Sequence, residues 1–255
     1  MPFQKIEPER VSTTAQRQVE QLILRGILRP GERLPSERDL AEKFGISRPT
    51  VREAIGILEE KGLLNTRPGS GIYIADVLGS AFSPALIDLF ARHEEALFDY
   101  LSLRRDLEGL AAARAATMAS DTDLKVVEAV FQKMEAAHSK RNPDAESRLD
   151  ADFHMSIVEA SHNVVLLHMM RSMFQMLKTG VFYNRQVMFK ARTTREALLD
   201  QHRTILECLL ARDPKAARKA IEDHLDFVLS CMEQDKKAQA NEAVARLRMM
   251  HEESR

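Results

Sequence analysis

An aspartate and a histidine lie one helical turn apart in the segment LDADFHMSIVEASHN, residues 149–163. Phe153 and Ile157 belong to the apolar stripe of a predicted helix, and Asp150 and His154 fall on the same face. A carboxylate and an imidazole on a buried face both need partners, because an unsatisfied polar group in an apolar core is costly. The pair therefore predicts either a satisfied core histidine beside an acid or a ligand-binding site.

Two further histidines lie on apolar helix faces. His202 and His224 each have apolar residues three and four positions away on both sides. Neutral imidazole and carboxylate suit zinc and other first-row divalent ions, and helical bundles bring such ligands together from several helices. This spacing is not specific by itself. Periodicity leaves two interpretations open, which are one metal site or three separately satisfied histidines.

The composition indicates a mainly α-helical protein. The chain has 255 residues, enough for two domains, with 5% aromatic residues and no tryptophan. Its two cysteines, Cys208 and Cys231, form no CxxC pair, so we expect a reduced cytoplasmic protein without a thiolate metal cluster. The apolar run VVLLHMM is too short to span a bilayer, and we expect no membrane association.

The first 76 residues contain the start and stop signals of short helices followed by a hairpin. Helical spacing of apolar residues runs over 11–28 and includes Ile27. Ser36 and Ser47 are predicted to cap the next two helices, and Gly45 to end the first of them. The segments LLNTR and IYIA, joined by PGSG, predict two antiparallel strands. Two helices and a hairpin predict a winged helix-turn-helix.

The predicted helix after Ser47 presents a polar side suited to duplex DNA. Its inner face is apolar, which leaves Arg48, Thr50 and Arg52 pointing outward. An arginine fork matches the acceptors of guanine in the major groove, and Arg38 and Arg67 are placed to hold phosphates. Residues 1–76 hold 12 Lys and Arg against 11 Asp and Glu, so net charge alone does not exclude an ordinary solvated face.

The stretch PGERLPSERDLAEKFGISRPTVREAIGILEEKGLL, followed by RPGSGIYI, resembles the DNA-binding domain of GntR-family bacterial transcription regulators. In that family, arginines of the two helices touch DNA and a wing-tip glycine enters the minor groove. Carried over position by position, the resemblance implies contacts from Arg38, Arg48, Arg52 and Gly69.

The remaining chain predicts an all-α helical bundle. We place the DNA-binding domain at 1–76, a linker and connecting helix at 77–93, the bundle at 94–236, and a charged, frayed or disordered tail at 237–255. The predicted helices lie near 84–92, 94–118, 122–139, 145–161, 163–190, 194–212 and 215–236.

Residues 95–235 resemble the FCD effector domain of the FadR subfamily of GntR regulators. The resemblance rests on LRRDLEGLAAARAA, DADFHMSIVEASHN and QHRTILECLLARDPKAARKAIEDHL. Metal-containing members bind one ion through one Asp and three His, which correspond here to Asp150, His154, His202 and His224. The resemblance thus implies one divalent ion per subunit, with zinc as first choice and manganese or nickel as alternatives.

An arginine on an apolar helix face indicates an anion nearby. Arg104 lies between Leu101 and Leu107, and its counterion is either Glu108, one turn on, or the carboxylate of an effector. We expect Arg104, Glu108 and Asn163 to contact the effector. The segment EASHNVVLLHMMR resembles regulators of pyruvate dehydrogenase and lactate genes, which implies a small 2-hydroxy or 2-oxo carboxylate such as lactate, pyruvate or glycolate.

These features together predict a metabolite-responsive transcription regulator. We expect a homodimer that represses from a palindromic operator and releases it when the carboxylate binds. One alternative keeps the regulator but makes the metal structural or itself the signal. Another is a metal-dependent enzyme fused to a DNA-binding domain, but no general base stands out near the ligands, so we expect no catalysis.

Overall fold

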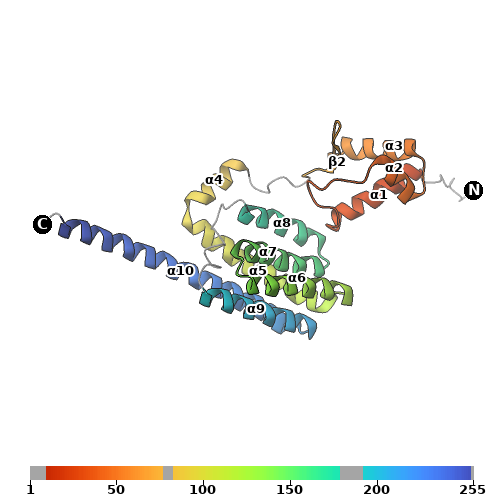
Figure 1. The fold of residues 1–255 in the computed structure, drawn as a ribbon. Helices are drawn as coiled ribbons and strands as arrows, with labels where there is room; N and C mark the ends of the chain where they lie inside the picture. Colours follow the sequence, from red (N-terminus) through yellow and green to blue (C-terminus); the bar gives the residue numbers. More distant parts are fainter. Residues whose placement is uncertain (1–9, 77–82, 179–191, 254–255) are drawn as a thin grey trace, which may run out of the picture. The chain divides into compact units, whose positions relative to one another are not determined.

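The computed structural model of the chain describes residues 10–76, 83–178 and 192–253. The chain forms two compact units, Met1–Ala81 and Phe82–Arg255. The division falls inside the stretch 77–93 in which we expected the linker. Helices dominate both units (Figure 1), and the prediction of a mainly α fold is confirmed.

The first unit contains three helices, α1 (Val11–Leu24), α2 (Glu37–Phe44) and α3 (Arg48–Glu60). Ser36 and Ser47 cap α2 and α3 by accepting from the backbone N–H groups three residues on, at 3.2 and 3.3 Å. Gly45 ends α2 in the left-handed region, with φ of 65°. These three predictions are confirmed, and they set the sharp turn that lays α3 across α1 and α2.

Two strands, β1 (Leu64–Arg67) and β2 (Gly71–Ile74), form the predicted antiparallel hairpin. Leu64 pairs with Ile74, and Arg67 with Gly71. Ile72 and Ile74 are buried against the helices, as their alternation predicts, so the other face of the hairpin is outward.

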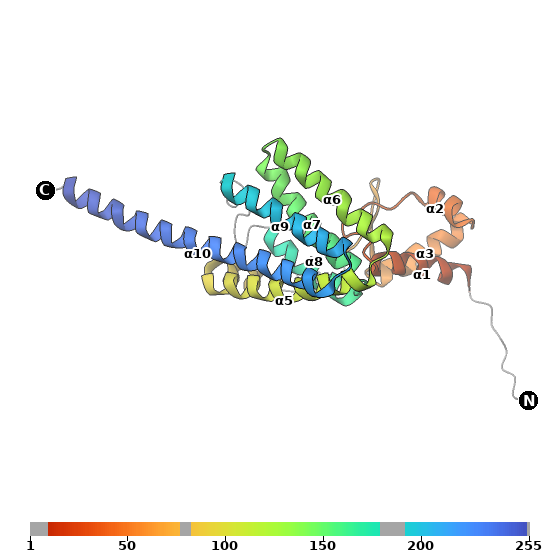
Figure 2. The same cartoon turned by 90° about the horizontal axis from the view of Figure 1, so that it is seen from below.

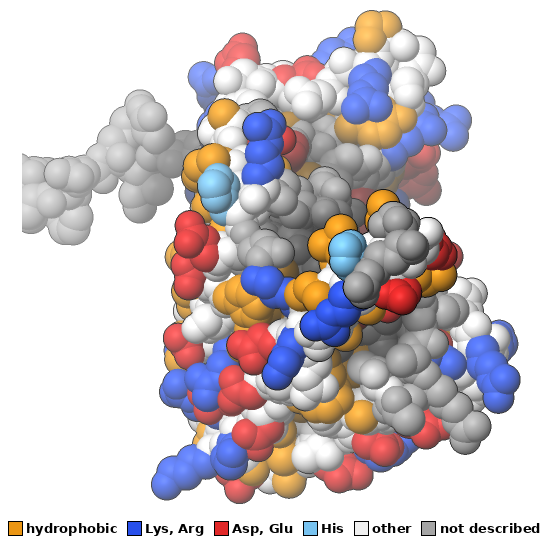
Figure 3. All heavy atoms as spheres, turned by 90° about the vertical axis from the view of Figure 1, so that its left-hand side faces the viewer, with side chains coloured by type: hydrophobic (Ala, Val, Ile, Leu, Met, Phe, Trp, Pro, Cys, Tyr) orange, Lys and Arg blue, Asp and Glu red, His pale blue; other side chains and the backbone are white. Residues whose placement is uncertain are grey.

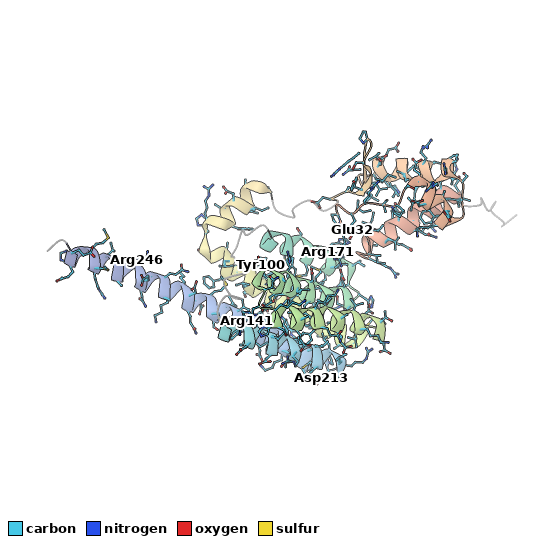
Figure 4. All side chains as sticks on the ribbon, in the orientation of Figure 1. Glu32, Tyr100, Arg141, Arg171, Asp213 and Arg246 are labelled. Carbon is cyan, nitrogen blue, oxygen red and sulfur yellow. The ribbon has the colours of Figure 1, made fainter. Side chains whose placement is uncertain are left out.

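The second unit is a bundle of seven helices among the described residues. They are α4 (Pro84–Arg92), α5 (Glu94–Met118), α6 (Asp121–Ser139), α7 (Pro143–Ala160), α8 (Val164–Lys178), α9 (Arg192–Leu210) and α10 (Pro214–Glu253). The long helix α5 runs beside α10, and α7 packs against α5, α6 and α8 (Figures 1 and 2). The hydroxyl of Tyr100 on α5, labelled in Figure 4, donates a hydrogen bond to the Met173 carbonyl of α8 at 3.1 Å.

The bundle core contains two apolar clusters, and α7, α9 and α10 contribute to both. Phe153, Ile205 and Leu225 belong to one cluster, and Val158 and Val228 to the other. Charged and polar side chains are buried along the same helices. Because such groups are costly in an apolar core unless they are paired, their positions identify the candidate site.

The structure differs from the sequence-based expectation at two places. Ile27 is exposed because α1 ends at Leu24 and Gly26 adopts φ of 74°. The expected frayed tail is instead the second half of α10, which continues to Glu253 (Figure 1). After Pro214 this helix has neither proline nor glycine, and pairs such as Arg246 with Glu242, at 3.0 Å, support its exposed part. Residues 179–190, predicted to continue α8, lie outside the described residues.

Within the described ranges, none of the helices is long and apolar enough to cross a membrane. Basic and acidic side chains are interspersed on the face shown in Figure 3, in keeping with a formal net charge of -1.

Deletion of residues 237–255 tests the independence of the exposed part of α10. Residues 237–253 are all exposed, and Arg246 marks this part of the helix in Figure 4. We expect the truncated protein to keep its melting temperature within about 2 °C, since the deletion removes no buried contact. Circular dichroism melts measure the change. A decrease of more than about 5 °C would show that the segment stabilises the fold.

Candidate functional site

The first candidate surface lies at the start of α3. Ser47 accepts from the Thr50 backbone, and the two hydroxyls lie 2.8 Å apart, so Thr50 belongs to the cap and is half-buried. Arg48 and Arg52 are exposed at this helix start, and Arg38 of α2 is exposed. A capped helix start with exposed guanidinium groups suits a phosphate backbone and base edges.

Arg52 is already held by a carboxylate. Its Nε lies 3.2 Å from both carboxylate oxygens of Glu37, and its Nη2 lies 2.8 Å from Oε2. The hydrogen bond with Arg52 lowers the pKa of Glu37, so this acid stays ionised at neutral pH. The pair uses two of the nitrogens with which Arg52 was expected to contact DNA. Glu37 therefore fixes the direction of Arg52 and offsets its positive charge.

The hairpin places the two predicted wing residues on its exposed side. Arg67 lies with its Cζ 4.6 Å from the centre of the Tyr73 ring. Gly69 is exposed at the turn with φ of 72°, a conformation that favours glycine.

The second candidate site is a buried cluster of four side chains from α7, α9 and α10, namely Asp150, His154, His202 and His224. One ligand atom from each side chain lies within 4.8 Å of all the others. The Nε2 atoms of His154 and His202 are 3.3 Å apart, and Asp150 Oδ1 lies 3.1 Å from His202 Nε2. The structure thus brings together all four residues that the sequence singled out.

The donor set fits a divalent ion. An ion about 2.0–2.2 Å from each ligand would place neighbouring ligand atoms roughly 3.0–3.5 Å apart. The separations of 3.1 and 3.3 Å lie in this range, whereas Asp150 Oδ1 lies 3.8 Å from His154 Nε2 and the four atoms span up to 4.8 Å, so the ligands would draw together around an ion. Neutral imidazole lone pairs that converge in a buried volume repel one another, and a cation between them removes the repulsion. The four residues could therefore hold one ion.

Two partners on the outside of the cluster orient its imidazole rings. Glu108 Oε2 lies 2.5 Å from His154 Nδ1, and Gln201 Oε1 lies 2.9 Å from His224 Nδ1. The Gln201 oxygen can accept a proton from His224 Nδ1, and the ionised Glu108 lies where it favours a proton on His154 Nδ1; both contacts favour the ring form in which Nε2 keeps its lone pair for the cluster. Glu108 and Gln201 thus select the ring form that a metal ligand needs.

Glu108 also pairs with Arg104 inside the bundle. Arg104 Nε lies 2.5 Å from Glu108 Oε1, and the two side chains are 1% and 2% exposed. Burial by itself would raise the pKa of Glu108, but Arg104 and His154 outweigh it and lower the pKa to about 2. Arg104 also lies 4.8 Å over the Phe174 ring. A chain of contacts therefore runs from Arg104 through Glu108 to His154.

Asn163, the third residue expected to contact the effector, lies at the start of α8. Its side-chain oxygen accepts from the Leu166 backbone at 3.1 Å and caps the start of α8. Its role in effector binding stays a prediction.

A second buried ion pair flanks the cluster. Arg195, at the start of α9, contacts Glu146 of α7 through Nη2 and Oε1 at 2.6 Å, and its Nη2 donates to the His138 carbonyl of α6 at 2.9 Å. A small pocket lined in part by His138, Glu146, Arg195 and His202 lies beside these contacts. The pair ties α9, which carries His202, to α6 and α7.

Sequence reasoning missed Glu37, Gln201, Glu146 and Arg195. The contacts of Glu37 and Glu146 span 15 and 49 residues, so no helical spacing indicates them. The one local signal was that Glu146 lies one turn before Asp150 on α7.

Replacement of Glu37 by glutamine tests the control of Arg52. We expect Glu37→Gln to bind duplex DNA of unrelated sequence more tightly and to lower the ratio of operator to unrelated affinity, because Arg52 gains mobility and unbalanced charge. Anisotropy titrations against a selected operator and a scrambled duplex measure this ratio. Glu42→Gln, at an exposed acid of the same helix, is the control. Equal ratios in the two variants would contradict the role of Glu37.

Replacement of Glu108 by glutamine tests the orientation of His154. The amide is similar in size but a weaker acceptor, so we expect zinc affinity to fall about 10- to 100-fold. Competition with a chromophoric chelator measures the affinity, and thermal unfolding of the metal-free protein checks the fold. The control is Glu159→Gln, on the same helix as His154, where Glu159 instead pairs with Arg171 at 2.8 Å. The role assigned to Glu108 is wrong if both variants bind zinc alike.

Comparisons with known proteins agree with this division of the chain. Residues 12–74 match the model of the gntR family of bacterial regulatory proteins, and residues 99–227 match the FCD domain. The first match covers α1 to β2, and the second covers most of α5 to α10 and all four residues of the cluster.

Similar proteins are found among curated sequences and solved structures. A protein of Escherichia coli (strain K12), named as an L-lactate dehydrogenase operon regulatory protein, is 35% identical over 96% of each chain. The Glc operon transcriptional activator of the same strain is 34% identical over 82% of this chain and 84% of its own. A solved structure of Streptococcus agalactiae GntR is 26% identical, covers 86% of this chain and 98% of its own, and has a TM-score of 0.51.

The chain therefore belongs to the gntR family of bacterial regulatory proteins, in the FadR-like subfamily with an FCD domain, and it is a DNA-binding transcription regulator rather than an enzyme.

Proposed function

We propose that the protein is a repressor that binds a palindromic operator as a homodimer and releases it when a small 2-hydroxy or 2-oxo carboxylate binds in the FCD domain. The observation that carries the proposal is the chain of contacts from Arg104 through Glu108 to His154, inside the bundle. It puts a guanidinium group that can bind a carboxylate next to a group of metal ligands.

Four residues of the chain would hold the ion, and one would hold the acid. A divalent ion bound by Asp150, His154, His202 and His224 would offer open coordination positions to two adjacent oxygens of the effector. Arg104 is rigid, planar and buried, so it favours a carboxylate over a neutral group. Glu108 is an anion that would repel the acid, so its part is to hold Arg104 and His154 in place rather than to contact the effector.

The relatives support the same class of effector. The regulator of the L-lactate dehydrogenase operon in Escherichia coli is 35% identical over almost the whole chain, and lactate is a 2-hydroxy carboxylate. The name of another relative describes an activator, so the direction of regulation is the part of the proposal that needs a direct test. Repression is tested by the release of operator on addition of the acid.

Helix α5 provides a route from the effector to the DNA-binding domain. It carries Arg104 and Glu108, and it follows α4 and the connection to the first unit in the sequence. An acid that binds Arg104 contacts α5 near the centre of the helix. If the acid prefers one position of α5, it shifts the population toward that position and changes how the two α3 helices of a dimer fit a palindrome.

A structural ion is the competing function for the same residues. The four ligands are all buried, which suits an ion that only stabilises the bundle. The two functions differ in one outcome, because a structural ion raises stability without making acid binding depend on it.

Replacement of Arg104 by lysine tests the effector site. Lysine keeps a positive charge opposite Glu108 but lacks the planar fork, so we expect the affinity for L-lactate or pyruvate to fall by at least about tenfold while zinc content stays unchanged. Calorimetric titration and elemental analysis measure the two quantities. Arg105→Lys is the matched control, since its neighbouring arginine is partly exposed and pairs with Asp226 at 2.7 Å.

Two results would contradict the proposal. One is equal acid affinity in Arg104→Lys and Arg105→Lys. The other is acid binding that survives complete removal of metal from the parent protein, which would support a structural ion instead.

A further inference from the structure

The β1–β2 hairpin, which forms the wing, pairs with a third extended segment, residues 32–34, that precedes α2. The Leu34 backbone donates to the Ile72 carbonyl at 2.8 Å, and the Ile74 backbone donates to the Glu32 carbonyl at 2.9 Å. Arg33 lies directly opposite Tyr73 in this pairing. Strand β2 therefore has β1 along one edge and residues 32–34 along the other.

Arg33 and Arg67 both lie on the outer face of this small sheet. Ile72 and Ile74 point into the core, so Gly71 and Tyr73 face outward. Residues directly opposite one another in a sheet point to the same side. Arg33 is opposite Tyr73 and Arg67 is opposite Gly71, so both arginines share the outer face.

The two arginine side chains cross β2 in opposite directions. Arg67 reaches over the Tyr73 ring, at 4.6 Å. Arg33 reaches over Gly71, where an added Cβ would come within 2.8 Å of its Nε and 3.3 Å of its Cζ. Gly71 thus leaves the space in which the Arg33 guanidinium lies over the β2 backbone. Each arginine therefore depends on one particular residue of β2, Tyr73 for Arg67 and Gly71 for Arg33.

The positive charge on this face is not neutralised within residues 10–76. Arg52 pairs with Glu37 at 2.8 Å, and Arg38 lies 3.5 Å from Asp39. In the same described range, neither Arg33 nor Arg67 forms an ion pair with a carboxylate, and both are exposed. The outer face of the wing is therefore a positively charged surface that can bind an anion, next to the wing tip at Gly69.

We propose that Arg33, together with Arg67, binds the phosphate backbone of duplex DNA through the outer face of the wing. The inference rests on operator binding by this domain and adds Arg33, which the sequence did not single out. Both guanidinium groups lie over β2 on the outer face of the sheet rather than at the start of helix α3, so we assign them to phosphates and not to base edges. Their contribution is the same for every DNA sequence.

Arg33→Ala tests this role through the salt dependence of binding. The variant binds both the selected operator and a scrambled duplex more weakly, by a similar factor, and keeps the base preference of the parent. The slope of log affinity against log salt concentration decreases by about one, because one phosphate contact is lost. Arg33→Lys keeps most of the slope, since a cation remains.

Lys61→Ala is the matched control. It also removes one positive charge, but Lys61 caps the far end of α3 from Arg48 and pairs with Glu20 at 2.7 Å. Circular dichroism of each variant verifies the fold, and Arg33→Gln replaces the alanine variant if the wing is destabilised.

The outcomes separate this inference from the proposed function. If the parent binds no palindrome specifically, the proposed function fails. A second outcome is that the parent protein binds a palindrome specifically while Arg33→Ala and Arg33→Gln match Lys61→Ala in DNA affinity and in salt dependence. In that case the phosphate contact assigned to Arg33 is wrong. A changed base preference in the Arg33 variants would also overturn it, because it would indicate base contact.

Discussion

Four electron-pair donors in an apolar core repel one another unless a cation or a shared proton lies between them, and the packing of α7, α9 and α10 brings four such donors together. The Nε2 atoms of His154 and His202 approach to 3.3 Å inside a bundle whose other buried residues are mainly apolar. Such an approach requires the rings to be held from outside. Glu108 and Gln201 do this on two sides, and the Glu146–Arg195 pair fixes α9 against α7.

Buried charges in this domain are connected rather than isolated. Arg104 would be costly in the core alone, and burial without Arg104 and His154 would raise the pKa of Glu108. Their contacts make an anion at Arg104 and an ion at the cluster parts of one electrostatic system. If the proposed ion and acid both bind, Glu108 would couple them, and neither would need a large movement of the helices to affect the other. The DNA-binding unit uses the same principle, since Glu37 determines where Arg52 points.

Local signals predicted much of the structure, and long-range contacts were beyond them. Ser47 and Gly45 act within three or four residues, so their caps could be read from the sequence. The ligand set followed from helical periodicity only with the help of a family resemblance, because periodicity cannot show that three faces converge. Arg33 could not be predicted, since its position depends on a glycine 38 residues later in the chain. The length of α10 was underestimated because charge was taken as a sign of disorder, although its exposed residues favour helix.

The central claim is that the buried cluster holds one divalent ion. Anomalous diffraction at the zinc absorption edge, from crystals of the zinc-saturated protein, tests it most directly. The account predicts a single strong peak per subunit, about 2.0–2.2 Å from one Asp150 oxygen and from one nitrogen each of His154, His202 and His224. The absence of a peak at these residues, or a peak only at surface side chains, would contradict it.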